Sequence, residues 1–451
     1  MLSYAGNSDM DFSGANYSAG VGLDANGKIS ITNSSFSNNQ GYAVYVDDDG
    51  GQLETFTTNS FSDNMTAVGV PADEVDALDE ATTFSDNTTA EVEIFATTYA
   101  TAKSSAWPNL NGNASYTISG NVYVKGDLTI DPGAHFELDQ DVIIHVTGSI
   151  NASGSDADHI VFTSSNVSGG LLWKGIYINS SSNLNVFDYV EVSYAGNGEM
   201  DFAGANYAAA IGLDQNGKIT LTNSSISDNA DYGLYVDNDG GQLEAFANNN
   251  FSNNVKAVGI PVNEVDDIDG LTTFNNNTFA EVEIFSTSLS DTKNVTWNAL
   301  SADAFYRVTG NLNIYGTVTI SPGAAFEFDE DVDMEIYGAL IAEGTATDMI
   351  TFTTSNVSGG LFWKGLFFQS ANSQNSLDYV EVSYGGKSDH QFAGANFSAN
   401  VGVNSGAQLS ITNSTISNGN SYGVYSIGTI NNIVDVSANN TFTSNVDGNS
   451  F

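Results

Sequence analysis

The stretch GTVTISPGAAFEFDEDVDMEIYGALIAEGT at residues 316–345 alternates apolar and polar residues in short runs. These runs are rich in β-branched and aromatic residues and are separated by Gly, Pro and Asp, a pattern that predicts β-strands. Between residues 306 and 353 such runs recur about every eight residues, so three strands fill about 24 residues. This spacing predicts a solenoid in which each coil of three strands stacks on the previous coil.

The chain of 451 residues is also a tandem array with a long period. The segment EVSYAGNGEMDFAGAN at 191–206 appears as LSYAGNSDMDFSGAN at 2–16 and as EVSYGGKSDHQFAGAN at 381–396. Corresponding residues stand 190 positions apart. A repeat of this length would hold about eight coils of about 24 residues.

The array divides into a partial first repeat (1–125), a complete repeat (126–315) and a partial final repeat (316–451). We expect these blocks to form one continuous all-β solenoid, a right-handed parallel β-helix, because the strand pattern runs through the block boundaries. Residue 2 falls where the complete copy has Val192, inside an expected strand. The natural protein is therefore expected to be longer than this chain.

Composition restricts the function. Ten Lys and Arg residues face 54 Asp and Glu residues, which gives a formal net charge of -44. This balance argues against nucleic-acid partners, because phosphate binding depends on Lys and Arg. The chain has no cysteine, so it cannot form disulfides. It also lacks a run of about 18 apolar residues, the feature that would predict membrane insertion.

The segment 316–345, followed by ITFTTSNVSGGLFWKGLFF at 350–368 and LDYVEVSYGG at 377–386, resembles right-handed parallel β-helix repeat proteins. The copy at 126–194 has the same signature. The resemblance is greatest to the large secreted surface proteins of Bacteroidota. It implies an extracellular or cell-surface location reached by export of the type IX kind, and it says little about activity.

Catalytic residues are sparse. Parallel β-helix lyases use Lys or Arg as the base, yet the single arginine, Arg307, has Thr117 as its counterpart. One group of carboxylates does repeat: Glu137, Asp139 and Asp141 recur as Glu327, Asp329 and Asp331. On a strand, alternate residues lie about 7 Å apart, a separation that suits the two carboxylates of a glycosidase. The same pattern is typical of an acidic solvent-facing surface, so both interpretations stay open.

Calcium is the metal that the sequence favours. The segments VDDDGGQLE (46–54), VDNDGGQLE (236–244), LDANGKI (23–29) and LDQNGKI (213–219) place oxygen donors at alternate positions beside glycines. Calcium prefers such hard oxygen ligands on a tight turn, although Asx-Gly pairs also form plain turns. The candidate ligands are Asp24, Asn26, Asp47, Asp49, Glu54, Asp214, Asn216, Asp237, Asp239 and Glu244.

Two further residue types allow two interpretations each. Trp173 and Trp363 lie in repeated WKG motifs, where a tryptophan is either a sugar-stacking platform or, given apolar flanks on both sides, a core residue. Asn33, Asn223 and Asn413 head matching stretches, where each is either a turn residue or part of a stacked asparagine ladder.

Together these features predict a non-enzymatic structural segment of a large extracellular bacterial surface or filament protein. It would act as a rigid stalk in adhesion or cell–cell contact. The expected partners are further copies of the chain, other surface proteins or cell-surface glycans. The alternative is a carbohydrate-binding or polysaccharide-degrading β-helix protein, because that fold also hosts such activities.

Overall fold

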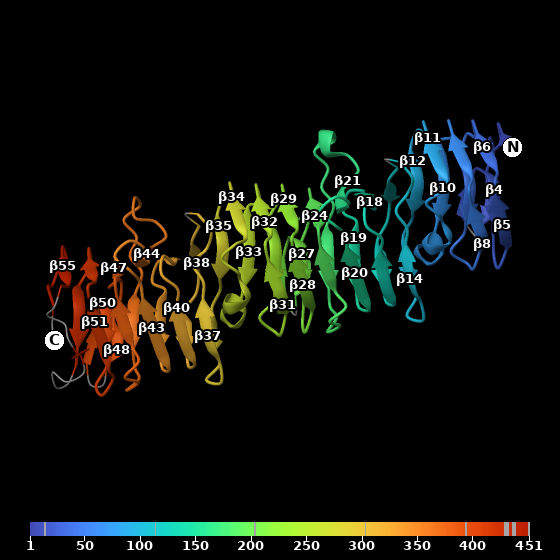
Figure 1. Ribbon diagram of the computed structural model, residues 1–451. Helices are drawn as coiled ribbons and strands as arrows, with labels where there is room; N and C mark the ends of the chain where they lie inside the picture. Colours follow the sequence, from blue (N-terminus) through green and yellow to red (C-terminus); the bar gives the residue numbers. More distant parts are fainter. Residues whose placement is uncertain are drawn as a thin grey trace. The chain divides into compact units, whose positions relative to one another are not determined.

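The computed structural model describes residues 1–12, 15–112, 114–202, 204–302, 304–392, 395–427, 433–434 and 439–449. The described structure is almost entirely β-strand, and its helices are the short 3₁₀ turns η1 (Ala72–Ala77), η2 (Val167–Gly169) and η3 (Val262–Asp267). The chain divides into unit 1 (Met1–Val255) and unit 2 (Lys256–Phe451). In each unit, parallel coils of about 24 residues stack on one another, which confirms the predicted solenoid (Figure 1).

Each coil pairs with the next through parallel strands. In unit 1, Val68 pairs with Val44 of the preceding coil and with Val92 of the following coil. Parallel pairing needs a long connection between neighbouring strands, and here the rest of the coil provides it. The expected alternation is confirmed on β17 (Asp127–Ile130), where exposed and buried residues alternate, so the apolar side chains fill the coil interior.

The described strands of unit 1 form parallel sheets A to E and antiparallel hairpins. Sheet A comprises β1 (Leu2–Ser3), β6 (Ser35–Ser37), β9 (Ser60–Ser62) and β11 (Thr83–Ser85), and sheet B comprises β5 (Lys28–Thr32) and β8 (Gln52–Thr57). Sheet C comprises β4 (Ala19–Leu23), β7 (Tyr42–Val46), β10 (Thr66–Val70), β12 (Ala90–Ile94), β15 (Tyr116–Ile118), β18 (His135–Leu138), β21 (Ile160–Ser164), β24 (Val190–Ser193), β29 (Ser225–Ser227) and β32 (Asn250–Ser252). Sheet D comprises β13 (Thr97–Tyr99), β16 (Val122–Val124), β19 (Ile143–Val146), β22 (Gly175–Ile178), β27 (Ala209–Leu213) and β30 (Tyr232–Val236). Sheet E comprises β14 (Ser104–Trp107), β17, β20 (Ser149–Ser153), β23 (Val186–Asp188), β28 (Lys218–Thr222) and β31 (Gln242–Ala247), and the hairpins are β2 (Met10–Phe12) with β3 (Ala15–Tyr17) and β25 (Met200–Phe202) with β26 (Ala205–Tyr207).

Unit 2 is built in the same way, from parallel sheets F to H, one further short strand and a hairpin. Sheet F comprises β33 (Lys256–Ile260), β35 (Ala280–Ile284), β38 (Tyr306–Val308), β41 (Ala325–Phe328), β44 (Ile350–Thr354), β47 (Val380–Ser383), β52 (Thr415–Ser417) and β55 (Thr441–Thr443). Sheet G comprises β36 (Thr287–Leu289), β39 (Leu312–Ile314), β42 (Asp333–Ile336), β45 (Gly365–Phe368), β50 (Ala399–Val403) and β53 (Tyr422–Ser426). Sheet H comprises β37 (Asn294–Trp297), β40 (Thr317–Ile320), β43 (Ala339–Glu343), β46 (Ser376–Asp378), β51 (Leu409–Thr412) and β54 (Ile433–Val434), the short strand is β34 (Thr273–Asn275), and the hairpin is β48 (His390–Phe392) with β49 (Ala395–Phe397).

The repeat of 190 residues does not contain a whole number of coils. In unit 1, sheet C steps from β4 through β7, β10, β12, β15, β18 and β21 to β24, which is seven coils. The second-copy equivalent of β4 is β27, which lies one face further along the coil, in sheet D. The repeat thus spans seven coils and one third instead of the predicted eight, because some coils are long: Ile160 pairs with Val190. Equivalent strands of the first two copies therefore belong to different hydrogen-bonded sheets.

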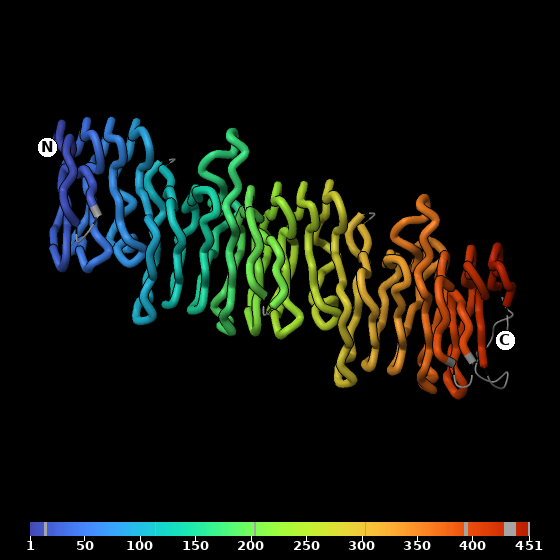
Figure 2. The backbone as a smooth tube through the Cα atoms, turned by 180° about the vertical axis from the view of Figure 1, so that it is seen from behind, coloured from blue at the N-terminus to red at the C-terminus, as the bar shows by residue number. Residues whose placement is uncertain are grey.

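Longer coils also carry protruding loops. In unit 1 the chain after β21 leaves the coil, forms η2 and returns to Trp173, and Figure 2 shows this loop rising beyond the neighbouring coils. Asn166 caps the short helix by accepting a hydrogen bond from the Gly169 N–H at 2.8 Å. Residues 166–170 are exposed, so these additional residues of the coil lie outside the core.

Aromatic side chains stack on one another inside the coils. In unit 1 the rings of Phe36 and Phe61, in successive coils of sheet A, are 4.8 Å apart and nearly parallel. In unit 2 Tyr306 and Phe326 stack in the same way, with ring centroids 4.9 Å apart. The parallel register places equivalent positions directly above one another, and each stacked pair contributes about 0.5–1.5 kcal/mol beyond its buried area.

A ladder of buried asparagines runs beside these rings. Asn39 donates from Nδ2 to Asn64 Oδ1 at 2.7 Å, and Asn64 donates in turn to Asn87 Oδ1 at 3.0 Å. The Asn64 side chain is fully buried and also bonds the backbone of neighbouring coils. The ladder thus satisfies backbone groups at a corner that the sheets leave unpaired.

The asparagines for which the sequence left a turn and a ladder open lie at turns. Asn33, Asn223 and Asn413 have φ angles of 47°, 50° and 49°, the left-handed turn conformation that asparagine tolerates. Asn223 donates to Asp188 Oδ1 at 2.7 Å, and Asn413 donates to Asp378 Oδ1 at 2.7 Å. Asn223 and Asn413 also accept hydrogen bonds from Asn248 and Asn439 of the next coil, at 3.4 Å and 3.2 Å. All three residues are therefore turn residues, and Asn223 and Asn413 also take part in a short side-chain ladder.

The hairpin β25–β26 packs on the outside of the second copy. Its Phe202 and Tyr207 rings lie 4.7 Å and 4.5 Å from the ring of Tyr235. Gly212 lies beneath Phe202, where an added Cβ would come within 2.5 Å of the ring. The glycine lets the hairpin ring lie directly on the strand backbone, so a second, external apolar cluster forms there.

Replacing Asn64 by alanine should destabilise unit 1 by about 2–4 kcal/mol, because the Asn39 N–H and the Phe36 carbonyl would lose their buried partners. Denaturant unfolding followed by circular dichroism measures the loss. The matched control is Asn7→Ala, at an exposed position. Equal midpoints for the two variants would contradict a structural role for the ladder.

Replacing Gly212 by alanine should detach the hairpin while leaving the core strands folded, because the new methyl group overlaps the Phe202 ring. Hydrogen exchange of the amides in 200–207 should accelerate at least about tenfold. Adding Phe202→Ala in the Gly212→Ala background should not accelerate that exchange further, since the ring is already displaced. Unchanged exchange in Gly212→Ala would show that the contact does not hold the hairpin.

Candidate functional site

The two calcium segments predicted in the first copy, 23–29 and 46–54, lie on adjacent coils. A backbone hydrogen bond of 2.9 Å from the Asp47 N–H joins the second turn to the first. Carboxylate oxygens of Asp47, Asp48 and Asp49 lie within 4.8 Å of one another. Asp47 and Asp49 belong to the predicted set, whereas Asp48 was missed because the prediction considered only alternate positions.

The other candidate ligands of the first copy do not belong to this three-carboxylate group. Asp24 and Asn26 are exposed on the neighbouring turn, where Asn26 has a φ of 61°. Glu54 is exposed on β8. The stacked turns thus concentrate charge at Asp47, Asp48 and Asp49.

In the second copy, the candidate ligands are held by protein groups. Asp214 is buried and accepts hydrogen bonds from the Tyr177 hydroxyl and from Asn179 Nδ2, the latter at 2.9 Å. Asp237 is also buried and accepts a hydrogen bond from the Asp239 N–H at 3.1 Å. These contacts stabilise the turn without an ion.

The remaining second-copy candidates are also engaged. Glu244 forms an ion pair with Lys218 at 2.7 Å, and Asn216 takes the left-handed turn conformation with a φ of 62°. Asn238 stands where the first copy has Asp48. Calcium binding stays a prediction, and the geometry favours Asp47, Asp48 and Asp49 for it.

Within each copy, the repeated carboxylates that suggested a glycosidase do not all lie on one strand. β18 ends at Leu138 and β41 ends at Phe328, so Asp139 and Asp329 follow their strands in turns. The spacing of alternate strand residues therefore does not apply to them. Asp139 accepts a hydrogen bond from Ser165 Oγ at 2.5 Å.

The carboxylate of Asp329, which corresponds to Asp139, is neutralised. Asp329 forms an ion pair with Arg307 at 2.9 Å and accepts a hydrogen bond from Ser355 Oγ at 2.7 Å. The guanidinium of Arg307 also lies over the Phe279 ring, 3.8 Å from its centroid. The single arginine of the chain thus has a structural arrangement that joins a loop to a turn.

Both repeated tryptophans are fully buried. Trp173 donates from Nε1 to the Ser193 carbonyl at 2.8 Å, and Trp363 donates to the Ser383 carbonyl at 2.7 Å. This confirms the core interpretation and excludes these rings as sugar-stacking platforms, because their faces do not reach solvent.

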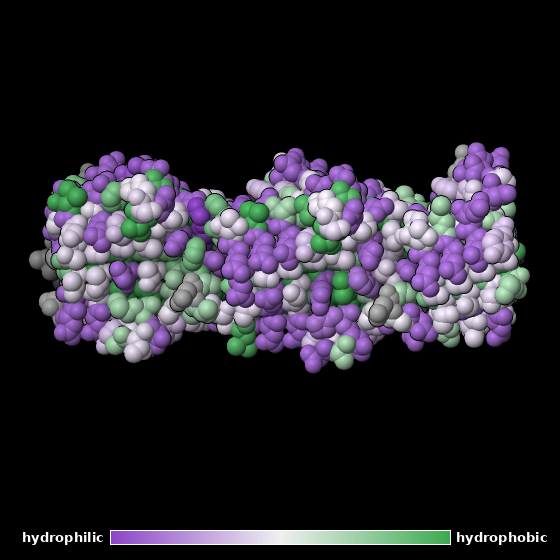
Figure 3. All heavy atoms as spheres, turned by 90° about the horizontal axis from the view of Figure 1, so that it is seen from above, coloured by the Kyte–Doolittle hydropathy of each residue, from purple (hydrophilic) through white to green (hydrophobic). Residues whose placement is uncertain are grey.

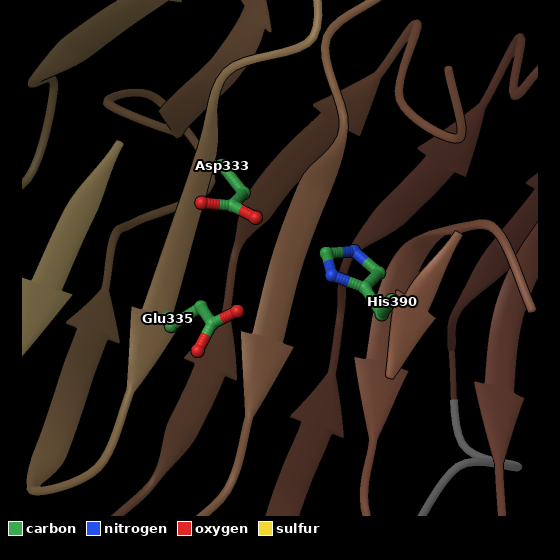
Figure 4. A group of neighbouring side chains, drawn as sticks. All are labelled: Asp333, Glu335 and His390. Atoms are coloured by element: carbon green, nitrogen blue, oxygen red, sulfur yellow. The ribbon is translucent and has the colours of Figure 1, made fainter. Parts of the chain in front are cut away.

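Sequence reasoning missed a mixed group of donors in unit 2. Asp333 and Glu335 lie on β42, and His390 begins the hairpin β48–β49; Figure 4 shows their side chains pointing into a common space. One ligand atom from each lies within 4.8 Å of the others. Asp333 and His390 are 2 % and 1 % exposed, so two of the three donors are inside the protein.

The surroundings of this group combine charge and apolar surface. Lys364 Nζ lies 2.8 Å from Asp333 Oδ2, and Gln369 Nε2 donates to Glu335 at 3.2 Å. The His390 ring stacks on Phe367 with centroids 4.5 Å apart. Burial, reinforced by Lys364, lowers the pKa of His390 to about 3, so the imidazole is neutral at physiological pH.

No protein-family model matches the chain, and no curated protein or solved structure matches it significantly.

The pH dependence of Asp47 provides a test of the calcium prediction. Burial, and next the charge of Asp48, raise the pKa of Asp47, so its ionisation disfavours the folded state. Stability from this group is therefore lost as the pH rises from the unfolded pKa through the folded one. Without divalent ions at pH 7, Asp47→Asn should melt at a higher temperature than the original chain.

Calcium should reverse this order, raising the melting temperature of the original chain and leaving that of Asp47→Asn nearly unchanged. Differential scanning calorimetry with calcium and with chelator measures both. Identical melting of the original chain under the two conditions would remove calcium from the account and leave a plain turn.

Proposed function

We propose that the chain is a non-enzymatic structural segment of a larger extracellular surface or filament protein, acting as a rigid stalk in adhesion or cell–cell contact. The observation that carries this proposal is the period of seven coils and one third in unit 1. Through this long repeat the coils stack without interruption, and equivalent strands of the first two copies join different sheets.

A row of identical binding sites along one face would require copies that align. In unit 1, β4 and β7 belong to sheet C, while their second-copy equivalents β27 and β30 belong to sheet D. Avidity for a flat target needs sites that engage simultaneously. Equivalent strands of the two copies thus have different ladder partners, whereas extension requires only that coil stack on coil without interruption, as sheet C does.

The residues suited to chemistry support the same conclusion. Trp173 and Trp363 are inside the core, and Asp329 is paired with Arg307. Asp139, the second-copy equivalent of Asp329, is bound by Ser165. These side chains stabilise coils and turns, so the repeated motifs are accounted for by structure.

The surface suits an exposed location. The face in Figure 3 is mainly hydrophilic or neutral, with hydrophobic residues in separate small patches. A formal charge of -44 keeps such a particle soluble and disfavours contact with nucleic acid. Within the described part of the chain, no helix has the length and apolar character needed to cross a membrane. Export of the type IX kind and membership of the surface proteins of Bacteroidota belong to this proposal.

A carbohydrate-binding role is the second candidate, and one observation in unit 2 favours it. Tyr315 and Tyr337 are 46 % and 39 % exposed, and their rings stack at 4.8 Å. Exposed aromatic rings beside hydrogen-bonding groups such as Gln369 suit sugar rings. The double variant Tyr315→Ala, Tyr337→Ala should lose binding on a glycan array if this candidate holds. If the original chain binds no glycan on the array, the carbohydrate-binding role is excluded for the glycans tested.

Immunogold electron microscopy of the producing cells, with antibody raised to this chain, tests the stalk. We expect label along surface appendages, because a stalk segment occupies the shaft. The control is antibody absorbed with purified chain, which should remove the label. Diffuse label in the medium without appendages would contradict the proposal and direct attention to polysaccharide turnover, with Asp139→Asn and Asp329→Asn as test variants.

A further inference from the structure

The group Asp333, Glu335 and His390 has the composition of a metal centre. Two carboxylates and one imidazole come from two elements, β42 and the hairpin β48–β49. Their ligand atoms lie within 4.8 Å of one another. Atoms bound to one ion at about 2.1 Å are at most about 4.2 Å apart, so small side-chain shifts complete the geometry.

The second copy shows what the same position needs for folding alone. One period earlier, Asp333 and His390 correspond to Ile143 and Met200. Met200 is buried, and Ile143 pairs with Gly175 on β22 as Asp333 pairs with Gly365 on β45. An apolar pair therefore satisfies this corner, and both members of the pair are replaced by metal-ligating residue types in the third copy.

Replacing the apolar pair by polar residues destabilises the folded state unless a partner compensates the buried charge. Lys364 offsets part of this cost for Asp333, yet Lys174 stands at the same position in the second copy, where Ile143 takes the place of Asp333. The lysine is therefore a feature of both copies, whereas Asp333 and His390 are additions of the third copy, and Glu335 stands where the second copy has His145.

We propose that Asp333, Glu335 and His390 bind a divalent first-row transition metal ion, Zn²⁺ being the probe of choice, and that the ion fixes the hairpin β48–β49 to the coil. The imidazole decides the class of ion, because calcium and magnesium prefer oxygen ligands alone. Phe367 holds the His390 ring from one side, with the ring centroids 4.5 Å apart.

Lys364 is the competing cation. Its Nζ lies 2.8 Å from Asp333 Oδ2, and its side chain is 21 % exposed, so it reaches solvent when an ion takes its place. Gln369 donates to Glu335 and orients that carboxylate from outside the donor group. Three protein ligands leave a further coordination position for water.

Isothermal titration of the chelator-treated chain with Zn²⁺, Ca²⁺ and Mg²⁺ at pH 7.5 tests the site. We expect one tight Zn²⁺ equivalent per chain and no comparable binding of Ca²⁺ or Mg²⁺. The variant Asp333→Ile, His390→Met carries the residues of the second copy, so it should fold normally and bind Zn²⁺ at least roughly 100-fold more weakly. Its circular dichroism and melting temperature verify the fold.

A second readout follows the hairpin. Zn²⁺ should slow hydrogen exchange of the amides in 395–397 of the original chain and leave the double variant unchanged. His159→Asn is the control, because His159 pairs with Glu191 at an exposed position and should not affect the tight site. Absence of tight Zn²⁺ binding, or equal binding by the double variant, would overturn the proposal and leave Lys364 as the resident cation.

Discussion

The in-register stacking of one coil on the next is the constraint on which the rest of this protein depends. Backbone hydrogen bonds between parallel strands fix each residue directly above its partner in the preceding coil, as Val68 lies between Val44 and Val92. Equivalent inward positions must therefore tolerate contact with side chains like themselves. Phenylalanine does so by ring stacking and asparagine by donating and accepting amide hydrogen bonds, which accounts for the ladders through Phe61 and Asn64.

The stacking constraint acts only on the inward-facing side chains and on the strands. The turns and loops at the corners of the coil can therefore vary in length. Coils that add a loop such as 165–172 lengthen the sequence period without disturbing the register. The outcome in unit 1 is a repeat that ends one face away from where it began. The coil interior continues from one copy into the next, and such a continuous stack is well suited to forming a long segment.

The hairpins are exempt from the stacking register, and there the copies diverge in chemistry. Phe202 and Tyr207 build an apolar cluster on the outer face of the second copy. At the corresponding hairpin of the third copy, His390 faces Asp333 and Glu335. An element that lies across a coil, instead of continuing it, is able to change one side chain without forcing changes in the neighbouring coils.

The sequence by itself determined the solenoid fold and the coil of about 24 residues, because the alternation of apolar and polar residues and its spacing indicate the stacked strands. The structure decided between the two interpretations of Trp173 and Trp363, which are buried. The sequence also named Asp47 and Asp49 as candidate calcium ligands. Only the tertiary structure decided which asparagines stack, how many coils a repeat spans, and that His390 meets Asp333. These depend on how loops and hairpins fold back on the coil, and neither periodicity nor residue spacing along the chain contains that information.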